Sequence, residues 1–223
     1  MKIATYNLRI IKGDDIKKGR GLLLRFPRIL KNIKKVDADV IAFQEVQTPH
    51  LWLLKLFLRG YNFHYAPFRD DGIFHGGNLI AWKKELLTQW KDIIQVPSKR
   101  DVPVVRVHFG EYSISFASIH LSLVEDKMED IKEIVTYPYG NIKRAILGDF
   151  NIPAEEEDNI VFKYLEDNQF TKLNKDLTGY HGYGYKEPAT PDNIFVNFGN
   201  MYDINVIGDN KASDHNLMYV TII

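Results

Sequence analysis

The sequence predicts one α/β domain built on two β-sheets packed face to face, with helices on the outside. Two observations lead to this fold class. Short apolar runs typical of strands recur from one end of the 223-residue chain to the other. Helical patterns are interleaved with these runs and are not collected in one half of the chain. The sequence has no internal repeat and no linker rich in Pro, Gly and Ser, so we expect a single domain over residues 1–223.

Nine runs are expected to form strands. Several alternate between apolar and polar residues, and others are continuous β-branched or aromatic runs, as expected of strands covered on both faces. In chain order the runs are Lys2–Tyr6, Asp39–Gln44, Asn62–Pro67, Asn78–Trp82, Val102–Phe109, Ser113–His120, Ile142–Leu147, Asn193–Val196 and Asn216–Ile222.

Helical spacing of apolar residues marks the elements between the strands. The first helix is expected over residues 26–36, with Pro27 in its first turn. The second lies at 128–135, and the third, at 160–165, is entered through an acidic turn. Residues 51–58 are apolar at every position but one. Because a helix that is apolar all round is usually a core helix, we expect this one to be buried; contact with a membrane is the alternative.

Composition excludes several functions. The chain has no cysteine, so it has no disulfide framework, zinc–thiolate site or cysteine nucleophile. Lys+Arg and Asp+Glu number 29 each, which argues against a protein that coats nucleic acid by bulk charge. No run approaches the roughly 18 apolar residues that a membrane-spanning helix needs. Because no export signal is visible either, we expect no stable membrane insertion and a cytoplasmic location.

The neutral total hides a basic segment. Residues 1–35 hold eleven Lys and Arg against two Asp, whereas the rest of the chain holds 18 basic and 27 acidic residues. Two interpretations are open: a solvated loop and helix surface, or a basic lip beside an acidic site.

Polar residues stand at the ends of several expected strands. An unpaired charge at the end of a buried strand is costly, so such groups either converge on one site or are capped separately. Each alone is an ordinary turn or surface residue, but together they supply oxygen ligands, two histidines and carboxylates to orient them. Hard oxygen ligands favour Mg²⁺ or Mn²⁺ over zinc. The residues are Asn7, Glu45, His120, Asp149, Asn151, Asp192, Asp214 and His215.

The motifs around these residues resemble those of the endonuclease/exonuclease/phosphatase superfamily. That resemblance implies the DNase I-like fold, a four-layer α/β sandwich of two packed mixed β-sheets flanked by helices. The motifs occur in the family's order along nearly the whole chain: Thr5-Tyr6-Asn7, Gln44-Glu45-Val46, Ile119-His120-Leu121, Gly148-Asp149-Phe150-Asn151, Pro191-Asp192-Asn193-Ile194-Phe195 and Ser213-Asp214-His215. One departure is Asn193, where the family more often has histidine or tyrosine.

For the metal site, the resemblance implies three residues. Glu45 corresponds to the principal ligand, Asn7 to the residue that orients the site beside it, and Asp214 to a second acidic position near the ion. The expected cofactor is Mg²⁺ or Mn²⁺.

For the reaction, the resemblance implies five catalytic residues. Asp149 and Asn151 correspond to the pair that positions the attacking water and holds the phosphate. His215 corresponds to the catalytic histidine, Asp192 to the carboxylate that orients it, and His120 to a second phosphate-contacting histidine. Either Asp149 or His215 acts as the general base, and the sequence leaves both open.

The expected reaction is therefore metal-dependent hydrolysis of a phosphodiester, with a nuclease acting on DNA or RNA as the first hypothesis. The basic segment leaves the first strand just after Asn7, which makes five of its residues candidates for holding phosphates: Arg9, Lys12, Lys17, Lys18 and Arg20. Three tyrosines of a glycine-rich stretch, Tyr180, Tyr183 and Tyr185, are candidates for stacking on bases.

Two other functions stay open. A phosphatase or lipid phosphodiesterase, acting on phosphoinositides or resembling a sphingomyelinase, would use the basic lip or the apolar residues 51–58. A binding module without activity would use the same scaffold, although the complete motif set argues against it. The sequence points to no protein partner.

Overall fold

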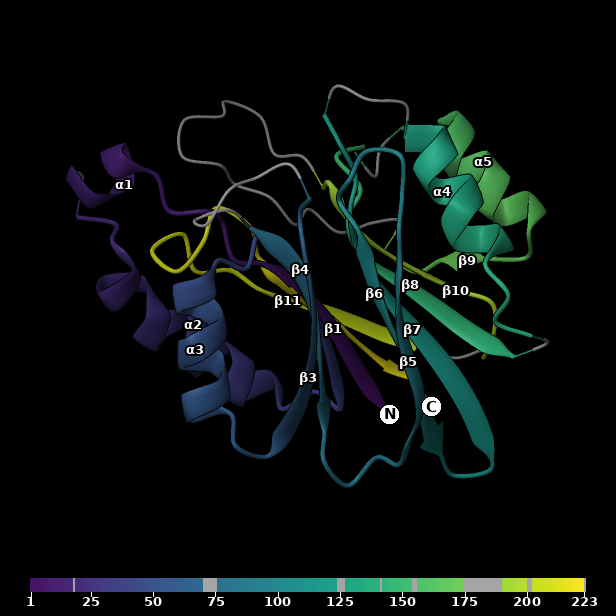
Figure 1. The fold of residues 1–223 in the computed structure, drawn as a ribbon, viewed down its shortest axis with the longest axis horizontal. Coiled ribbons are helices and arrows are strands. Elements are labelled where there is room, and N and C mark those ends of the chain that lie inside the picture. Colours follow the sequence, from purple (N-terminus) through teal and green to yellow (C-terminus); the bar gives the residue numbers. More distant parts are fainter. Residues whose placement is uncertain are drawn as a thin grey trace.

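The computed structural model describes residues 1–17, 19–69, 76–123, 127–140, 142–153, 156–174, 190–199 and 202–222. Two mixed six-stranded sheets pack face to face, with helices on both outer sides (Figure 1). This confirms the predicted four-layer α/β fold.

The first sheet has the strand order β11-β12-β1-β2-β4-β3. Only β1 and β2 are parallel among its described pairs, and the others are antiparallel. In chain order its strands are β1 (Lys2–Asn7), β2 (Val40–Gln44), β3 (Tyr61–Pro67), β4 (Gly77–Lys83), β11 (Tyr202–Ile207) and β12 (Leu217–Ile222).

The second sheet has the strand order β5-β6-β7-β8-β10-β9. Here β7 and β8 are the parallel pair. Its strands are β5 (Thr88–Ile94), β6 (Val102–Phe109), β7 (Tyr112–His120), β8 (Lys143–Asp149), β9 (Thr171–Lys172) and β10 (Asp192–Val196).

Helices cover the outer face of each sheet. Figure 1 shows α2 (Leu22–Val36) and α3 (Thr48–Phe57) on one side, and α4 (Lys127–Thr136) and α5 (Ile160–Asp167) on the other. The short α1 (Gly13–Lys17) precedes α2. Three apolar cores result: one between each sheet and its helices, and one between the sheets.

The inter-sheet core follows from strand alternation. Successive side chains of a strand point to opposite faces, so every second residue enters this layer. The layer is built from members that share this spacing, including Ile3 on β1, Val40 and Ala42 on β2, Ile114 and Phe116 on β7, Ala145 and Leu147 on β8, and Ile194 and Val196 on β10.

Three strands of the structure, β5, β9 and β11, are not among the nine that the sequence predicts. Each lies at the edge of its sheet. An edge strand has one neighbour and more exposure to water, so its apolar pattern is weaker. In β5, for example, the sequence is TQWKDII. Its first five residues are polar or aromatic, and all five are exposed or half-buried.

The helix predicted from residue 26 begins earlier, and Pro27 lies inside it and not in its first turn. Proline lacks the N–H that would bond the carbonyl of Leu23. Leu23 is on the exposed side of the helix, where water can satisfy that carbonyl. The helix therefore tolerates the proline.

The expectation that residues 51–58 are buried is wrong for half of this element. In α3, His50 and Leu54 are buried, whereas Trp52, Leu56 and Phe57 are exposed. One side of the helix faces the sheet and the other side is apolar but open. No helix among the described residues is long and apolar enough to cross a membrane.

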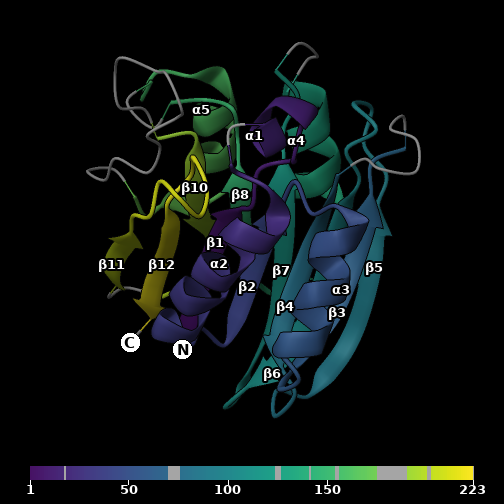
Figure 2. The ribbon, with the colours of Figure 1, turned by 90° about the vertical axis from the view of Figure 1, so that its left-hand side faces the viewer.

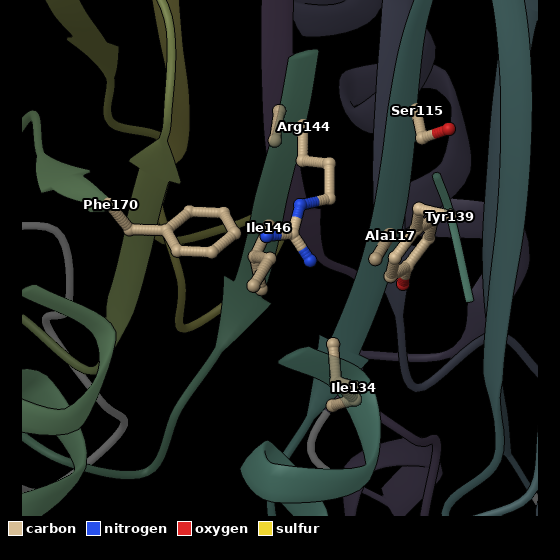
Figure 3. A pocket seen from close by; sticks show the side chains of 8 residues that line it. Ser115, Ala117, Ile134, Tyr139, Arg144, Ile146 and Phe170 are labelled. Atoms are coloured by element: carbon tan, nitrogen blue, oxygen red, sulfur yellow. The ribbon is translucent and has the colours of Figure 1, made fainter. Parts of the chain in front are cut away.

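The second sheet is joined to its helices partly through Arg144 of β8. Figure 3 shows its guanidinium between the rings of Phe170 and Tyr139, with Ile134 of α4 nearby. Its Nη1 donates to the carbonyl of Val135 at 2.8 Å. Burial lowers the pKa of Arg144 from its ordinary value. This contact ties β8 to the end of α4.

Candidate active site and metal centre

Strand alternation and register bring the predicted residues to one end of the inter-sheet layer. Asn7, His120, Asp149 and Asp192 each stand an even number of positions from inter-sheet core residues of their strands, so all face the same layer. The register then aligns three of them, because β8 pairs Asp149 with His120 of β7 and with Asp192 of β10. β1 begins beside the labelled N-terminus, so its Asn7 end lies at the opposite end of the sheet (Figure 1).

Glu45 follows β2 in a left-handed backbone conformation, with φ at 56°, which a non-glycine residue adopts only when its surroundings fix it. Its Oε2 accepts the Ile10 amide at 2.6 Å, and its Oε1 accepts Asn7 Nδ2 at 3.2 Å. Burial raises the pKa of Glu45, but the nearby His120 and the Ile10 amide outweigh it and hold the pKa below its usual value.

Asp149 lies at the centre of the site. Its carboxylate accepts Asn7 Nδ2 at 2.9 Å and the Asn151 amide at 2.8 Å. The Nε2 atoms of His120 and His215 lie 3.6 and 3.8 Å from its Oδ2. Burial raises the pKa of Asp149, but the two histidines and the hydrogen bonds together bring it below its ordinary value. The carboxylate is therefore ionised at neutral pH.

His215 and Asp192 form a buried pair, with His215 Nδ1 2.7 Å from Asp192 Oδ2. Burial opposes the charged imidazole, but Asp192 more than compensates and raises the pKa of His215 to about 10. Burial also raises the pKa of Asp192, to about 6, against the opposing effect of His215. At neutral pH the pair is an imidazolium and a carboxylate.

His120 differs from His215 in charge. Burial lowers the pKa of His120 more than the carboxylates of Asp149 and Glu45 raise it, so this imidazole is neutral at pH 7. Its Nε2 lies 3.9 Å from Glu45 Oε1, and its ring packs against Phe68 with centroids 5.8 Å apart.

Asn151 and Asp214 complete the set. Asn151 has a left-handed backbone, with φ at 49°, and its Nδ2 donates to the Leu121 carbonyl at 2.6 Å. Asp214 lines the same cleft, but its Oδ2 is bonded to the guanidinium of Arg9. Arg9 also contacts Asp15 at 3.2 Å. Two carboxylates therefore hold the arginine that the sequence offers as a phosphate contact.

Two of the other basic candidates lie elsewhere. Lys17 ends α1 and is not among the residues that line the cleft. Arg20 lines a separate groove with Arg28 and Lys211. Lys18, Tyr180, Tyr183 and Tyr185 lie outside the described residues.

The cleft has a volume of about 470 Å³ and includes residues that the sequence analysis did not single out. The most informative is Arg100, whose Nη1 donates to the Leu121 carbonyl at 3.3 Å and whose guanidinium lies 5.4 Å from the Phe68 ring centre. The basic run Ser98-Lys99-Arg100 before β6 is the sequence signal that could have indicated it. Of the predicted basic residues, Lys12 lines the cleft beside Arg9, and the lining residues outside the predicted set are Ile10, Phe68, Arg100, Leu123, Pro153 and Pro191.

A chain of buried hydrogen bonds beneath the cleft links the two sheets. Gln44 accepts from Thr5 Oγ1 at 3.2 Å and donates to Ser118 Oγ at 3.2 Å. Ser118 then donates to the Phe43 carbonyl at 3.1 Å. These four residues hold β1, β2 and β7 in register directly behind the site.

The residues fit a hard divalent cation. One ligand atom each from Glu45, His120 and Asp149 lies within 4.8 Å of the others, and two of these atoms are carboxylate oxygens. Asn7 donates to both carboxylates and so holds them on one centre. A second group of Asp149, Asp192 and His215 meets the same distance limit, but there the imidazole is already bound to Asp192.

Comparison with known proteins places this chain in a family of hydrolases. A sequence profile of the Endonuclease/Exonuclease/phosphatase family matches residues 4–215. The chain therefore belongs to this family, whose members are hydrolases acting on phosphoester bonds and generally depend on a divalent metal ion. A search of curated protein sequences finds no match.

Solved structures share the fold over the whole chain. A family protein from Bacteroides vulgatus superposes with a TM-score of 0.83 at 15% identity, over 100% of this chain and 98% of that one. A mannosyl-6-phosphatase from Bacteroides thetaiotaomicron has a TM-score of 0.77 at 20% identity, over 100% and 99%. TDP2 from Caenorhabditis elegans has a TM-score of 0.74 at 15% identity, over 100% and 74%.

Proposed function

We propose that the chain is a Mg²⁺- or Mn²⁺-dependent phosphoesterase. The observation that carries the proposal is the convergence of His120 and His215 on Asp149, with Glu45 close by. Glu45 is proposed as the principal metal ligand, within the group that it forms with Asp149 and His120. Asn7 is proposed to orient the two carboxylates, and Asp214 to be a second acidic group near the ion. The bound ion would neutralise a phosphate oxygen and stabilise the charge that develops in the transition state.

The charge states support a role for each catalytic side chain. Ionised Asp149 is the proposed general base, because His215 keeps its proton at neutral pH and is proposed to stabilise the phosphoryl charge instead. Asp192 orients His215 and keeps it cationic. His120 Nε2 and the Asn151 amide, which has a second N–H to offer, are proposed to contact the phosphoryl oxygens.

Replacing Glu45 tests the proposal. Both Glu45→Ala and Glu45→Gln should lower hydrolysis of bis-p-nitrophenyl phosphate by about 10²- to 10³-fold with Mg²⁺ or Mn²⁺, since each removes the negative ligand charge. Calorimetric titration with Mn²⁺ should show weaker binding in both variants. The matched control, Glu111→Ala, changes an exposed carboxylate away from the cleft and should leave both readouts unchanged. Full metal-dependent activity in Glu45→Ala would show that the assignment is wrong.

We propose a nucleic acid as the first substrate to test, with the scissile phosphate in the cleft and flanking phosphates on its basic border. Arg9, Lys12 and Arg100 lie in the cleft wall, and the sequence continues with the basic residues Lys17, Lys18 and Arg20. Binding of flanking phosphates releases counterions, so it makes the affinity depend on salt.

Neutralising this border gives the second prediction. Lys17→Ala combined with Arg20→Ala should weaken DNA binding at low salt and reduce the slope of log affinity against log salt by about 0.9 for each phosphate that the variant no longer neutralises. Fluorescence anisotropy with labelled single- and double-stranded DNA measures both effects. Lys91→Ala on β5 is the control. Identical affinity at every salt concentration would remove Lys17 and Arg20 from the proposal.

A phosphatase or lipid phosphodiesterase is the second candidate. It is favoured by the apolar Phe68 and Leu123 in the cleft wall, and the structural likeness to a mannosyl-6-phosphatase adds a sugar phosphate to the substrates worth testing. A panel with Mg²⁺ or Mn²⁺ separates the candidates: intact and abasic DNA, RNA, sphingomyelin, phosphoinositides, mannose 6-phosphate and bis-p-nitrophenyl phosphate.

A further inference from the structure

Exposed apolar side chains gather on the outer surface of α1, α2 and α3. A contiguous exposed apolar surface of this kind marks a binding site for another protein, a ligand or a membrane. Leu23 is 80% exposed and Trp52 is 73% exposed. We define the docking face as the exposed residues Ile16, Leu23, Leu24, Trp52, Leu56 and Phe57.

A groove of about 420 Å³ joins the three helices at one end of this surface. Figure 2 shows α2 and α3 lying side by side over the first sheet, with α1 above them. The groove is lined mainly by apolar residues of α1 and of the first turns of α2 and α3: Ile11, Ile16, Gly21, Leu22, Leu23, Leu24, Gln47 and Pro49.

Helical spacing extends the apolar surface along α3. Trp52 and Leu56 are four residues apart, so they lie on the same side of the helix. The next residue, Phe57, packs its ring 5.8 Å from Phe26 of α2. The two helices therefore present one apolar surface that continues from the groove.

The charged residues of α2 and α3 have one sign. Neither α2 nor α3 contains an Asp or Glu. The exposed cations of the two helices and of the turn after α3 are Arg28, Lys31, Lys34, Lys35, Lys55 and Arg59. The basic excess of the N-terminal segment thus borders the docking face.

We propose that this surface docks on an anionic bilayer, with the docking face at the boundary of the acyl chains and the surrounding cations on lipid phosphates. A surface helix with an apolar side and basic flanks binds in this way. A symmetric dimer through the same surface would oppose the cations of α2 and α3 with one another, and neither helix offers a carboxylate to pair them. Aliphatic side chains do not stack on bases, so the surface is poorly suited to nucleic acid.

Docking would bring the active-site cleft to the lipid headgroups. One short segment separates the two surfaces, since Ile10 lines the cleft and Ile11 lines the groove. The Ile10 amide donates to Glu45 Oε2 at 2.6 Å, and the Ile11 amide donates to Gln47 Oε1 at 2.9 Å. The docking itself does not depend on the chemistry proposed for the cleft.

Vesicle sedimentation with the full chain tests the proposal. The protein should pellet with phosphatidylcholine vesicles containing about 30% phosphatidylserine, remain largely in solution with pure phosphatidylcholine, and bind less as salt rises from about 0.1 M to about 0.5 M. Replacing Leu23, Trp52 and Leu56 together by Ser should weaken vesicle binding by at least about tenfold. Replacing the equally exposed Leu87 and Ile160 by Ser should not.

Two controls separate docking from catalysis. The Leu23/Trp52/Leu56 variant should hydrolyse soluble bis-p-nitrophenyl phosphate like the unmodified chain, and Glu45→Ala should still bind vesicles. Absence of vesicle binding by the unmodified chain overturns the proposal, and so does equal binding by the triple variant. It is also overturned if light scattering finds a dimer that the triple variant abolishes, or if that variant loses DNA binding and not vesicle binding.

Discussion

Individual residues at the site hold backbone conformations that their side chains do not favour. Arg9 and Glu45 have φ values of 57° and 56°, each of which costs about 1 kcal/mol or more for a non-glycine residue. Such conformations persist where surrounding contacts fix them. The Ile10 amide on Glu45 and the Asp214 carboxylate on Arg9 are contacts of that kind. Backbone strain is therefore present at two residues of the candidate site.

The charge of His215 gives a prediction about pH. Its pKa is about 10 in the folded chain and about 6.5 when unfolded, so its stabilising effect is complete below pH 6.5 and is lost as the pH rises through 10. In Asp192→Asn the carboxylate that raises this pKa is absent. The free energy of unfolding of the metal-free chain should therefore fall more steeply between pH 6.5 and 10 than it does in Asp192→Asn.

Urea unfolding at several pH values, with a chelator present, measures the difference. Asp203→Asn, at an exposed position on β11, is the control and should follow the unmodified chain. Parallel curves for Asp192→Asn and the unmodified chain would contradict the raised pKa.

At the scale of elements, β8 depends on a glycine inside the strand. Gly148 has a φ of 152°, and a Cβ there would lie 2.0 Å from the carbonyl oxygen of Ile119. The backbones of β7 and β8 approach closely at this point, one residue before His120 and Asp149 pair. The sequence alone allows Gly148-Asp149 to be a plain turn, because the approach involves a neighbour distant in the chain.

Gly148→Ala should destabilise the fold by about 2–4 kcal/mol, since the clash is with backbone and cannot be relieved by rotating a side chain. Gly60→Ala is a matched control, because a Cβ at Gly60 meets nothing within 4 Å, and should change stability by less than about 0.5 kcal/mol. Urea midpoints compare the two. Similar midpoints would show that β7 and β8 separate at low cost.

The sequence predicts central elements better than peripheral ones. All nine expected strands are present, and the three that escaped prediction are edge strands with weak apolar patterns. The place of Pro27 inside its helix and the exposure of one side of α3 were not predicted, for a different reason. Whether a helix carbonyl reaches water, or an apolar side of a helix is covered, depends on neighbours that periodicity does not reveal.

At the scale of the whole molecule, Arg25 connects a helix to two of the loops that border the site. The side chain is 1% exposed. Its Nε donates to the Ala212 carbonyl at 2.7 Å, and its guanidinium also bonds the carbonyls of Leu8 and Arg9. One residue of α2 thus joins the loop after β1 to the loop before β12.

Arg25→Met keeps the stem but leaves these carbonyls without their donor. We expect a loss of about 2–4 kcal/mol in stability, together with a lower kcat for bis-p-nitrophenyl phosphate under conditions where the variant is folded. Arg28→Met is the control, because Arg28 makes an exposed pair with Asp209 at 3.5 Å and exposed pairs contribute little. An unchanged kcat in folded Arg25→Met would show that the loops keep their positions without it.

Motif order is enough to nominate the polar residues around Asp149, but it does not reveal their long-range partners. The hydrogen bond of Arg9 with Asp214 spans 205 positions, and Arg100 enters the cleft from the loop before β6. Lys17 and Arg20 leave the cleft because the chain turns into α1 and α2 after Lys12. A count of charges along the chain does not reveal that turn.

The alternation that aims Asn7, His120, Asp149 and Asp192 at one layer has a consequence for how the chain can change. Deleting one residue within β1, β7, β8 or β10 reverses which face the terminal side chain occupies, so the strands that carry the chemistry cannot gain or lose single residues. Loops beyond the strand ends carry no such constraint. Changes in loop length can therefore alter what the cleft admits while the side chains at the strand ends stay in place.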